Sequence, residues 1–302
     1  VIMPSYTFVS TANSFVLRGA IPVFIDIHPS TLNINEDLIE KAITHKTKAI
    51  VAVHYAGVSC DMKKILKIAK KHNLIVIEDA AQSFHSEFEG KQLGTIGDLG
   101  AFSFHETKNI ISGEGGSLLI NKSRYSKRAE IIRDKGTNRS SFLRGEIDKY
   151  TWKDIGSSFL TSELTAAFLF AQLQNSKKVL SKRLKIWNYY HKNLKYFEEK
   201  GLLSRFYVPK YNKHNAHMYF IIISKKYNRN KILNLFKNRN IFPTFHYVPL
   251  HSSPAGRKFG KVSGSMEVTN DYSKRLIRLP LHPGLRKKDQ NFILETLNNI
   301  LS

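Results

Sequence analysis

The sequence is short of cysteine, of acidic side chains and of long hydrophobic runs. Its single cysteine, Cys60, cannot form an internal disulfide, which excludes a disulfide-stabilised scaffold and fits a reducing cytoplasm. No apolar stretch approaches the roughly 20 residues of a membrane-spanning helix, and the run at residues 219–223 has the length of a buried strand. From these absences we expect a soluble, cytoplasmic protein that has no membrane partner.

Acidic residues number 24 against 47 lysines and arginines, which gives a net charge of +23 and an isoelectric point near 9.9. Such a charge is typical of nucleic-acid-binding proteins. The basic residues are spread over predicted helices, as between Lys63 and Lys71, and the abundance of Asn and Ile favours a general compositional bias. We therefore expect no nucleic-acid partner. A cationic surface would instead attract a phosphorylated cofactor and a diphosphate-bearing substrate.

The chain has 302 residues, which exceeds one ordinary small domain and predicts one large unit and one smaller unit. A change of pattern near Leu180 predicts a large domain over residues 1–179 and a small C-terminal domain over residues 180–302. The first four residues have the pattern of a strand interior followed by a stop. We therefore expect part of the large domain to precede Val1.

The N-terminal half alternates helical and strand patterns. Asn35 and Asp61 are good N-caps, and the helix after Asp61 has one apolar face with its lysines on the other. This repetition predicts a mainly parallel sheet with helices on both faces, so the polar side chains that follow the strands are the site candidates. Helices are predicted over 7–17, over 36–43 and after Asp61, and strands over 21–27, 48–53, 74–77, 99–104 and 117–121.

The C-terminal part has a different pattern. A long helical stretch begins at Thr161 and continues past Leu184. Beyond it, strands predicted over 216–223 and 241–247 alternate with helices over 231–237 and 289–301. This order indicates a small α/β domain.

Three motifs follow strands of the predicted sheet. They are Glu78-Asp79-Ala80-Ala81-Gln82, Ser103-Phe104-His105-Glu106-Thr107-Lys108 and Gly113-Glu114-Gly115-Gly116. Strand alternation puts Glu78 and Asp79 on opposite faces of the sheet. The glycines either let the backbone approach a ligand closely or form an ordinary tight turn. His105-Glu106 lacks the second histidine of the zinc-protease pattern, so we expect no metal site.

With these motifs the sequence resembles the DegT/DnrJ/EryC1/StrS sugar aminotransferases, of the fold-type I group shared with aspartate aminotransferase. The resemblance runs over nearly the whole chain, from Pro4-Ser5-Tyr6-Thr7-Phe8 through His246-Tyr247-Val248-Pro249-Leu250-His251 to Arg278-Leu279-Pro280-Leu281. It implies an α/β fold with a mainly parallel sheet in the large domain and a smaller α/β C-terminal domain. It also implies pyridoxal 5′-phosphate as the cofactor.

The resemblance assigns roles to single positions. Lys108 matches the lysine that carries the cofactor. Its amine must lose a proton to be nucleophilic, and partial burial lowers the pKa of a lysine for this task. Asp79 matches the carboxylate at the pyridine nitrogen. These two are the implied catalytic residues. The other implied cofactor-binding residues are Gln82 at the phenolic oxygen, Ser103 at the phosphate and Phe8 on the ring face. The implied substrate residues are His217, His246 and Tyr247.

Two departures from the family pattern concern the phosphate. Many members have an asparagine, offered by the second subunit, where this chain has Leu160, and a leucine side chain cannot make that hydrogen bond. Ser157 or Ser158 could replace it, and we take Ser158 as the candidate. The family's upstream glycine/serine/threonine turn would lie before Val1.

The resemblance also implies a reaction. L-Glutamate gives its amine to the 4-keto carbon of dTDP-4-keto-6-deoxyglucose. The branch that makes dTDP-4-amino-4,6-dideoxygalactose is the nearest, on stretches such as Lys135-Gly136-Thr137-Asn138-Arg139-Ser140 and Tyr150-Thr151-Trp152. The product would serve a surface polysaccharide such as an enterobacterial common antigen, and the enzyme would be a homodimer.

Two alternatives remain open. A dehydratase of the same family has histidine in place of the lysine, and Lys108 argues against it. A non-catalytic or truncated homologue with a binding or regulatory role would keep the fold without the activity.

Overall fold

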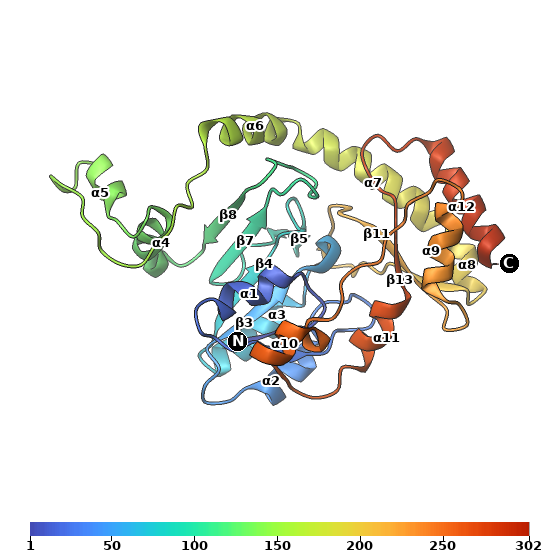
Figure 1. The fold of residues 1–302 in the computed structure, drawn as a ribbon, viewed down its shortest axis with the longest axis horizontal. Helices are drawn as coiled ribbons and strands as arrows, with labels where there is room; N and C mark the ends of the chain where they lie inside the picture. The colour runs from blue at the N-terminus through green and yellow to red at the C-terminus, as the bar shows by residue number, and fades with distance from the viewer. Residues whose placement is uncertain (302) are drawn as a thin grey trace.

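The computed structural model describes residues 1–301, and a seven-stranded sheet lies at its centre (Figure 1). The strand order is β12-β2-β1-β3-β4-β7-β8, and every neighbouring pair is parallel except β7 and β8. The predicted mainly parallel α/β sheet is thereby confirmed. The strands are β1 (Ile2–Pro4), β2 (Val23–Ile25), β3 (Ala49–Val53), β4 (Ile75–Asp79), β7 (Leu99–Ser103), β8 (Gly116–Ile120) and β12 (Lys261–Val262).

The helices between the first strands begin at the predicted caps. The Asp61 carboxylate accepts the backbone N–H of Lys64 at 3.0 Å, and the helix that follows packs its apolar face on the sheet with its lysines outward. Asn35 likewise accepts the N–H of Asp37, but it begins a 3₁₀ turn before the α-helix. These elements are α1 (Val9–Val16), η1 (Glu36–Leu38), α2 (Ile39–Ala42), η2 (Tyr55–Gly57) and α3 (Met62–Lys71).

A smaller unit lies beside the large sheet at the far end of α7 (Figure 1). Its antiparallel sheet has the order β13-β11-β9, and β11 is buried along its whole length. The boundary predicted between residues 179 and 180 falls inside α7 and stays a prediction. The elements are α6 (Glu163–Gln174), α7 (Ser176–Asn193), α8 (Lys195–Glu199), β9 (Leu203–Arg205), β11 (Tyr219–Ile223), α9 (Arg229–Lys237), α11 (Glu267–Arg275), β13 (Leu276–Leu279) and α12 (Lys287–Leu301).

The strand predicted over 241–247 is wrong. This segment forms one isolated bridge, between Thr244 and Arg278, and otherwise no strand. Pro243 has no N–H to give to a ladder, and Tyr247 has a φ of +40°, which ends the extended backbone. The strand predicted over 216–223 begins only at Tyr219, because Ala216 also has a positive φ, of +49°.

The chain then returns to the large sheet. The backbone N–H of Leu250 donates to the carbonyl of Ser5 at 3.0 Å, and His251 N–H donates to the Ser5 hydroxyl at 3.1 Å. Lys261 and Val262 then form β12, which pairs with β2 at the sheet edge. The connecting elements are η4 (Leu250–Ser252) and α10 (Pro254–Phe259).

Residues 122–160 form an arm that projects from the end of β8 away from both units (Figure 1). The arm contains η3 (Ser123–Tyr125), α4 (Ser126–Arg133) and α5 (Arg139–Leu143). A separate small sheet is formed by β5 (Glu87–Phe88), β6 (Lys91–Gln92) and β10 (Asn212–Lys213). Across residues 1–301, no helix combines the length and the apolar character that crossing a membrane requires.

Candidate active site

A pocket of about 510 Å³ opens at the carboxyl ends of β3, β4 and β7, where ligands bind in sheets of this type. Segments distant in sequence meet there, including the loop after β1, the 241–247 segment and β13. Eight of the nine predicted site residues line it: Phe8, Asp79, Gln82, Ser103, Lys108, His217, His246 and Tyr247. The sequence motifs therefore come together in one cavity.

Asp79 is the last residue of β4, and its carboxylate is held from two sides. The Thr11 hydroxyl donates to Oδ2 at 2.6 Å, and the backbone N–H of Ala81 donates to Oδ1 at 3.2 Å. Thr11 in turn accepts the hydroxyl hydrogen of Thr7 at 2.8 Å, because its own hydrogen is given to Asp79. Asp79 thus faces the pocket in a fixed orientation.

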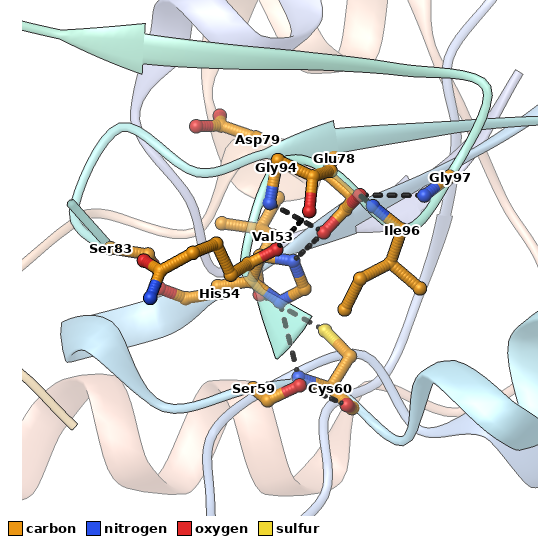
Figure 2. Close-up of polar contacts among 12 residues, drawn as sticks. Val53, His54, Ser59, Cys60, Glu78, Asp79, Ser83, Gly94, Ile96 and Gly97 are labelled. Carbon is orange, nitrogen blue, oxygen red and sulfur yellow. Dashed lines mark hydrogen bonds and ion pairs between the residues drawn. The ribbon is translucent and has the colours of Figure 1, made fainter. Parts of the chain in front are cut away.

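Glu78 points to the opposite side of β4, as strand alternation predicts (Figure 2). Its fully buried carboxylate accepts the backbone N–H groups of Gly94, Ile96 and Gly97 at 2.6–2.7 Å. Burial alone would raise the pKa of Glu78, but His54 and these backbone hydrogen bonds hold it below its ordinary value. The carboxylate therefore fixes the loop before β7.

His54 links this network to the pocket wall (Figure 2). Its Nδ1 accepts the backbone N–H of Cys60 at 3.2 Å, so its ring proton lies on Nε2, which donates to Glu78 at 2.9 Å. The Cys60 thiol donates to the carbonyl of Val53, and burial raises its pKa well above the ordinary value. This cysteine is a packed structural residue with an unreactive thiol.

Lys108 lies in a loop that the glycine motif holds in place. The N–H groups of Phe104 and Glu106 donate to the carbonyls of Gly115 and Gly113, each at 2.8 Å. Gly113 has a φ of +81°, which favours glycine at that position. The role of these glycines here is thus to position the lysine loop.

Burial lowers the pKa of Lys108 below its usual 10.5. The negative charge of Asp79 acts in the opposite direction, and the positive charge of Arg278 adds to the lowering. The amine therefore reaches its uncharged, nucleophilic form at lower pH than an exposed lysine does.

His246 and Tyr247 form an ordered aromatic wall. Their rings are stacked with centroids 3.7 Å apart, and His246 Nδ1 lies 2.6 Å from the Tyr55 hydroxyl. The Gln82 amide donates to the Tyr247 hydroxyl at 2.7 Å and keeps a second N–H for a ligand. Burial and the charge of Arg278 lower the pKa of His246 to about 2, so its ring is neutral.

His217 is fixed by two asparagines. Asn109 donates to the carbonyl of Asn215 at 3.0 Å, so its Oδ1 is the acceptor for His217 Nδ1 at 3.2 Å. Burial lowers the pKa of His217 well below its ordinary value, and its Nε2 is therefore a hydrogen-bond acceptor.

Two other predicted residues, Phe8 and Ser158, are less enclosed by the pocket than the residues above. Phe8 caps α1 and is 55% exposed, with its ring centroid 6.2 Å from that of Tyr247. Ser158 lies in the arm, where it forms a bridge with Asp134, and it does not line the pocket of its own chain. Its predicted role concerns the pocket of a second copy and remains a prediction.

Sequence reasoning missed Arg278, Thr11 and Tyr55. The hydroxyls of Thr11 and Tyr55 carry no signal in the sequence, because their role depends on which strand end lies beside them. Arg278 does carry one, since it is a single charge in the apolar run Leu276-Ile277-Arg278-Leu279. Arg278 also begins the stretch Arg278-Leu279-Pro280-Leu281, which carries part of the family resemblance but assigns no role to the arginine.

The pocket suits an aromatic, phosphorylated aldehyde cofactor. A carboxylate (Asp79), an amine with a lowered pKa (Lys108) and an aromatic ring (Phe8) converge on it, and the Ser103 hydroxyl lines the same cavity. A volume of about 510 Å³ lies in the range of small-molecule sites.

Comparison with known proteins identifies the family. The profile of the DegT/DnrJ/EryC1/StrS aminotransferase family matches residues 1–298. The chain is 36% identical to an uncharacterized protein of Methanocaldococcus jannaschii, over 100% of this chain and 79% of the relative. It is 31% identical to GDP-perosamine synthase of Escherichia coli O157:H7, again over 100% of this chain and 79% of the relative.

Solved structures lead to the same family. Helicobacter pylori PseC, an aminotransferase involved in the biosynthesis of pseudoaminic acid, superposes with a TM-score of 0.91 at 27% identity, over 99% of this chain and 79% of its own. A family member from Brucella abortus gives a TM-score of 0.89 at 27% identity, over 100% of this chain and 79% of its own. The chain therefore belongs to the DegT/DnrJ/EryC1/StrS family and is a pyridoxal-phosphate-dependent sugar aminotransferase.

Proposed function

We propose that the chain transfers the amine of L-glutamate to the 4-keto carbon of dTDP-4-keto-6-deoxyglucose. The products are 2-oxoglutarate and dTDP-4-amino-4,6-dideoxygalactose, and the latter serves a surface polysaccharide of the enterobacterial common antigen type. The observation that carries the proposal is the convergence of Lys108, Asp79 and the His246-Tyr247 wall in one pocket. Both substrates are cytoplasmic metabolites in this proposal.

When bound, pyridoxal phosphate supplies an aldehyde that accepts an amine and a ring that takes up the electron pair released at the substrate carbon. Lys108 would hold the cofactor through its amine and, with that amine free again, would move a proton at the substrate carbon. Asp79 keeps a proton on the pyridine nitrogen, a task that its fixed orientation toward the pocket supports. Gln82 offers its remaining N–H to the phenolic oxygen.

The sugar occupies the part of the pocket lined by His217, His246 and Tyr247. The lowered pKa of both histidines keeps their rings neutral, so they serve the sugar hydroxyls as hydrogen-bonding groups without adding charge. This fits a neutral hexose ring.

The enzyme acts as a homodimer in this proposal. Apolar side chains on the arm and on α6 lie exposed, among them Trp152 at 79% and Leu164 at 85%. Many exposed large apolar side chains in one stretch of chain are typical of a protein interface. The dimer would bring the arm, with Ser158, to the partner's pocket.

The experiment is a coupled assay of purified protein with pyridoxal phosphate, glutamate and dTDP-4-keto-6-deoxyglucose. A GDP-linked 4-keto-6-deoxy sugar is the competing substrate, because GDP-perosamine synthase is among the relatives. Borohydride reduction followed by peptide mass analysis should place the cofactor on Lys108. The matched control is Lys122→Ala, an exposed lysine outside the pocket.

Preference for the dTDP sugar, with loss of activity in Lys108→Ala alone, supports the proposal. Preference for the GDP sugar would change the proposed substrate to a GDP-linked sugar and leave the proposed transamination in place. Cofactor attachment and activity that survive Lys108→Ala would overturn the assignment of the lysine.

A further inference from the structure

Thr11 gives its hydroxyl hydrogen to Asp79 and not to its own helix. It is the buried residue of α1, and its Oγ1 donates to Asp79 Oδ2 at 2.6 Å. A threonine inside a helix often bonds the carbonyl three or four residues earlier. Ser14 of the same helix does so, because its hydroxyl donates to the carbonyl of Thr11 at 3.1 Å. The direction of the Thr11 hydroxyl is therefore set by a contact outside the helix.

A second threonine extends this contact. Thr7 Oγ1 lies 2.8 Å from Thr11 Oγ1, and Thr7 is the donor because the hydrogen of Thr11 is given to Asp79. Thr7 is 2% exposed and lines the pocket. Its donation polarises the Thr11 hydroxyl and strengthens the bond of that hydroxyl to the carboxylate. The three side chains thus form a one-way chain of hydrogen bonds that ends on a negative charge.

The carboxylate of Asp79 has unused acceptor positions. An ionised carboxylate has about four of them. Glu78 accepts four hydrogen bonds from the framework, whereas Asp79 accepts only those of Thr11 and of the Ala81 N–H. Within residues 1–301, Asp79 forms no ion pair with a lysine, arginine or histidine. Both of its donors are neutral groups, so neither takes the place of a cationic ligand.

Under the proposed function, Asp79 shares a proton with the pyridine nitrogen. In a partly buried pocket a pyridinium facing a carboxylate is costly, and transfer of the proton to the oxygen would remove both charges. A hydrogen bond donated to the charged form of a carboxyl group favours that form. The Thr11 hydroxyl therefore opposes this transfer and leaves the proton on the nitrogen, where it makes the ring a better acceptor of electrons.

We propose that Thr11, supported by Thr7, is a positioning residue that holds the Asp79 carboxylate ionised and so keeps the proton on the pyridine nitrogen of the cofactor. This inference rests on the proposed function, because it takes Asp79 as the partner of that nitrogen. The competing explanation is a purely structural one, in which the same hydrogen bond only fastens α1 to the end of β4. The two explanations differ in what they predict for the protonation of the nitrogen.

The test measures that protonation directly. Pyridoxal phosphate labelled with ¹⁵N in the ring is bound to the wild type, Thr11→Val and Thr11→Ser, and the ¹⁵N chemical shift is recorded. Valine keeps the branched shape without the hydroxyl, and serine keeps the hydroxyl. The matched control is Ser14→Ala, which removes an exposed hydroxyl from the same helix. Single-turnover conversion of glutamate to 2-oxoglutarate and thermal melting are measured on the same samples.

In Thr11→Val the ¹⁵N resonance should move downfield, toward the position of an unprotonated pyridine. The single-turnover rate should fall roughly 10- to 100-fold, because one hydrogen bond to a charged group is lost. The glutamate concentration that gives half of the maximal rate should change much less. Thr11→Ser and Ser14→Ala should keep the wild-type shift. Thr7→Val, which removes only the outer hydrogen bond, should move the resonance in the same direction by a smaller amount.

An unchanged ¹⁵N shift in folded, cofactor-loaded Thr11→Val would overturn the inference and leave the fastening of α1 as the task of Thr11. If the valine variant does not fold or does not take up the cofactor, Thr11→Cys replaces it, since a thiol is a much weaker donor, and the same two results decide. A wild type whose ring nitrogen is unprotonated, or which takes up no cofactor, would instead overturn the role of Asp79 in the proposed function.

Discussion

The two consecutive carboxylates of β4 differ in the direction they face and in the hydrogen bonds they accept. Asp79 faces the pocket and is held by two donors, whereas Glu78 faces the protein interior and accepts four hydrogen bonds. Because side chains alternate along a strand, a separation of one residue places one carboxylate in the pocket and the other in the framework. One strand end thus supplies both a carboxylate that lines the pocket and the anchor of the loop behind it.

The largest effect is expected from Glu78→Gln. It removes the charge from a buried site and puts an NH₂ group against backbone donors, so the free energy of unfolding should fall by about 3–5 kcal/mol. Urea denaturation measures this loss. The control is Glu199→Gln, in an exposed pair with Lys195, which should not move the urea midpoint.

The same variant has a pH signature. The folded-state pKa of Glu78 lies below the ordinary 4.5, so its stabilisation is present above that value and is lost as the pH falls through the lower, folded-state pKa. The gap in stability between the wild type and Glu78→Gln should therefore narrow in acid. A gap that stays constant down to pH 3 would contradict the framework role.

Asp79→Asn should affect activity and leave stability nearly unchanged. Replacing the charge that we propose faces the pyridine nitrogen by a neutral amide of the same shape should reduce kcat on the order of 10²- to 10³-fold. Steady-state kinetics and thermal melting are measured on the same preparation. A variant that keeps its activity but melts at a much lower temperature would show that Asp79, like Glu78, serves stability and not catalysis.

The pKa of Lys108 gives a finer comparison, because it reports the electrostatic effect of each carboxylate on the pocket. It can be followed in cofactor-free protein by ¹³C NMR of dimethylated lysines, with Lys108→Arg for assignment. Asp79→Asn should lower the pKa of Lys108 further, because the Asp79 charge raises it, whereas Glu78→Gln should leave it in place. Equal shifts in both variants would show that the two faces of β4 are not electrostatically independent.

The smallest effect is expected at Cys60, the outer member of the Glu78 network. Cys60→Ala removes one thiol contact and should cost about 1 kcal/mol of stability. Because burial raises its pKa and hides it, the thiol should react with a disulfide reagent only on unfolding. Rapid labelling of the native protein would mean that the network opens locally.

Much of the large domain follows from sequence patterns alone. The caps at Asn35 and Asp61, the alternation of Glu78 and Asp79 and the strand ends before Lys108 all depend on neighbours within a few residues. Local rules of hydrogen bonding and periodicity therefore suffice for them.

The remaining features depend on contacts between distant segments. Tyr247 keeps a φ of +40° because its ring stacks on His246 and its hydroxyl accepts from Gln82, and no local pattern contains that information. Likewise, Arg278 becomes a site residue only when β13 is brought against the pocket of the large sheet. The sequence therefore predicts the strand ends at the pocket better than the backbone of the 241–247 segment and the placement of β13.

The pairing of β12 with β2 has a consequence for biosynthesis. Val23 and Phe24 leave the ribosome early, but their partners Lys261 and Val262 follow more than two hundred residues later. At roughly 5–20 residues per second, that edge of the nascent sheet stays open for about ten seconds or longer. During this interval an unpaired strand is open to edge-to-edge association, so a nascent chain stalled before residue 261 should be the form that chaperones hold most tightly.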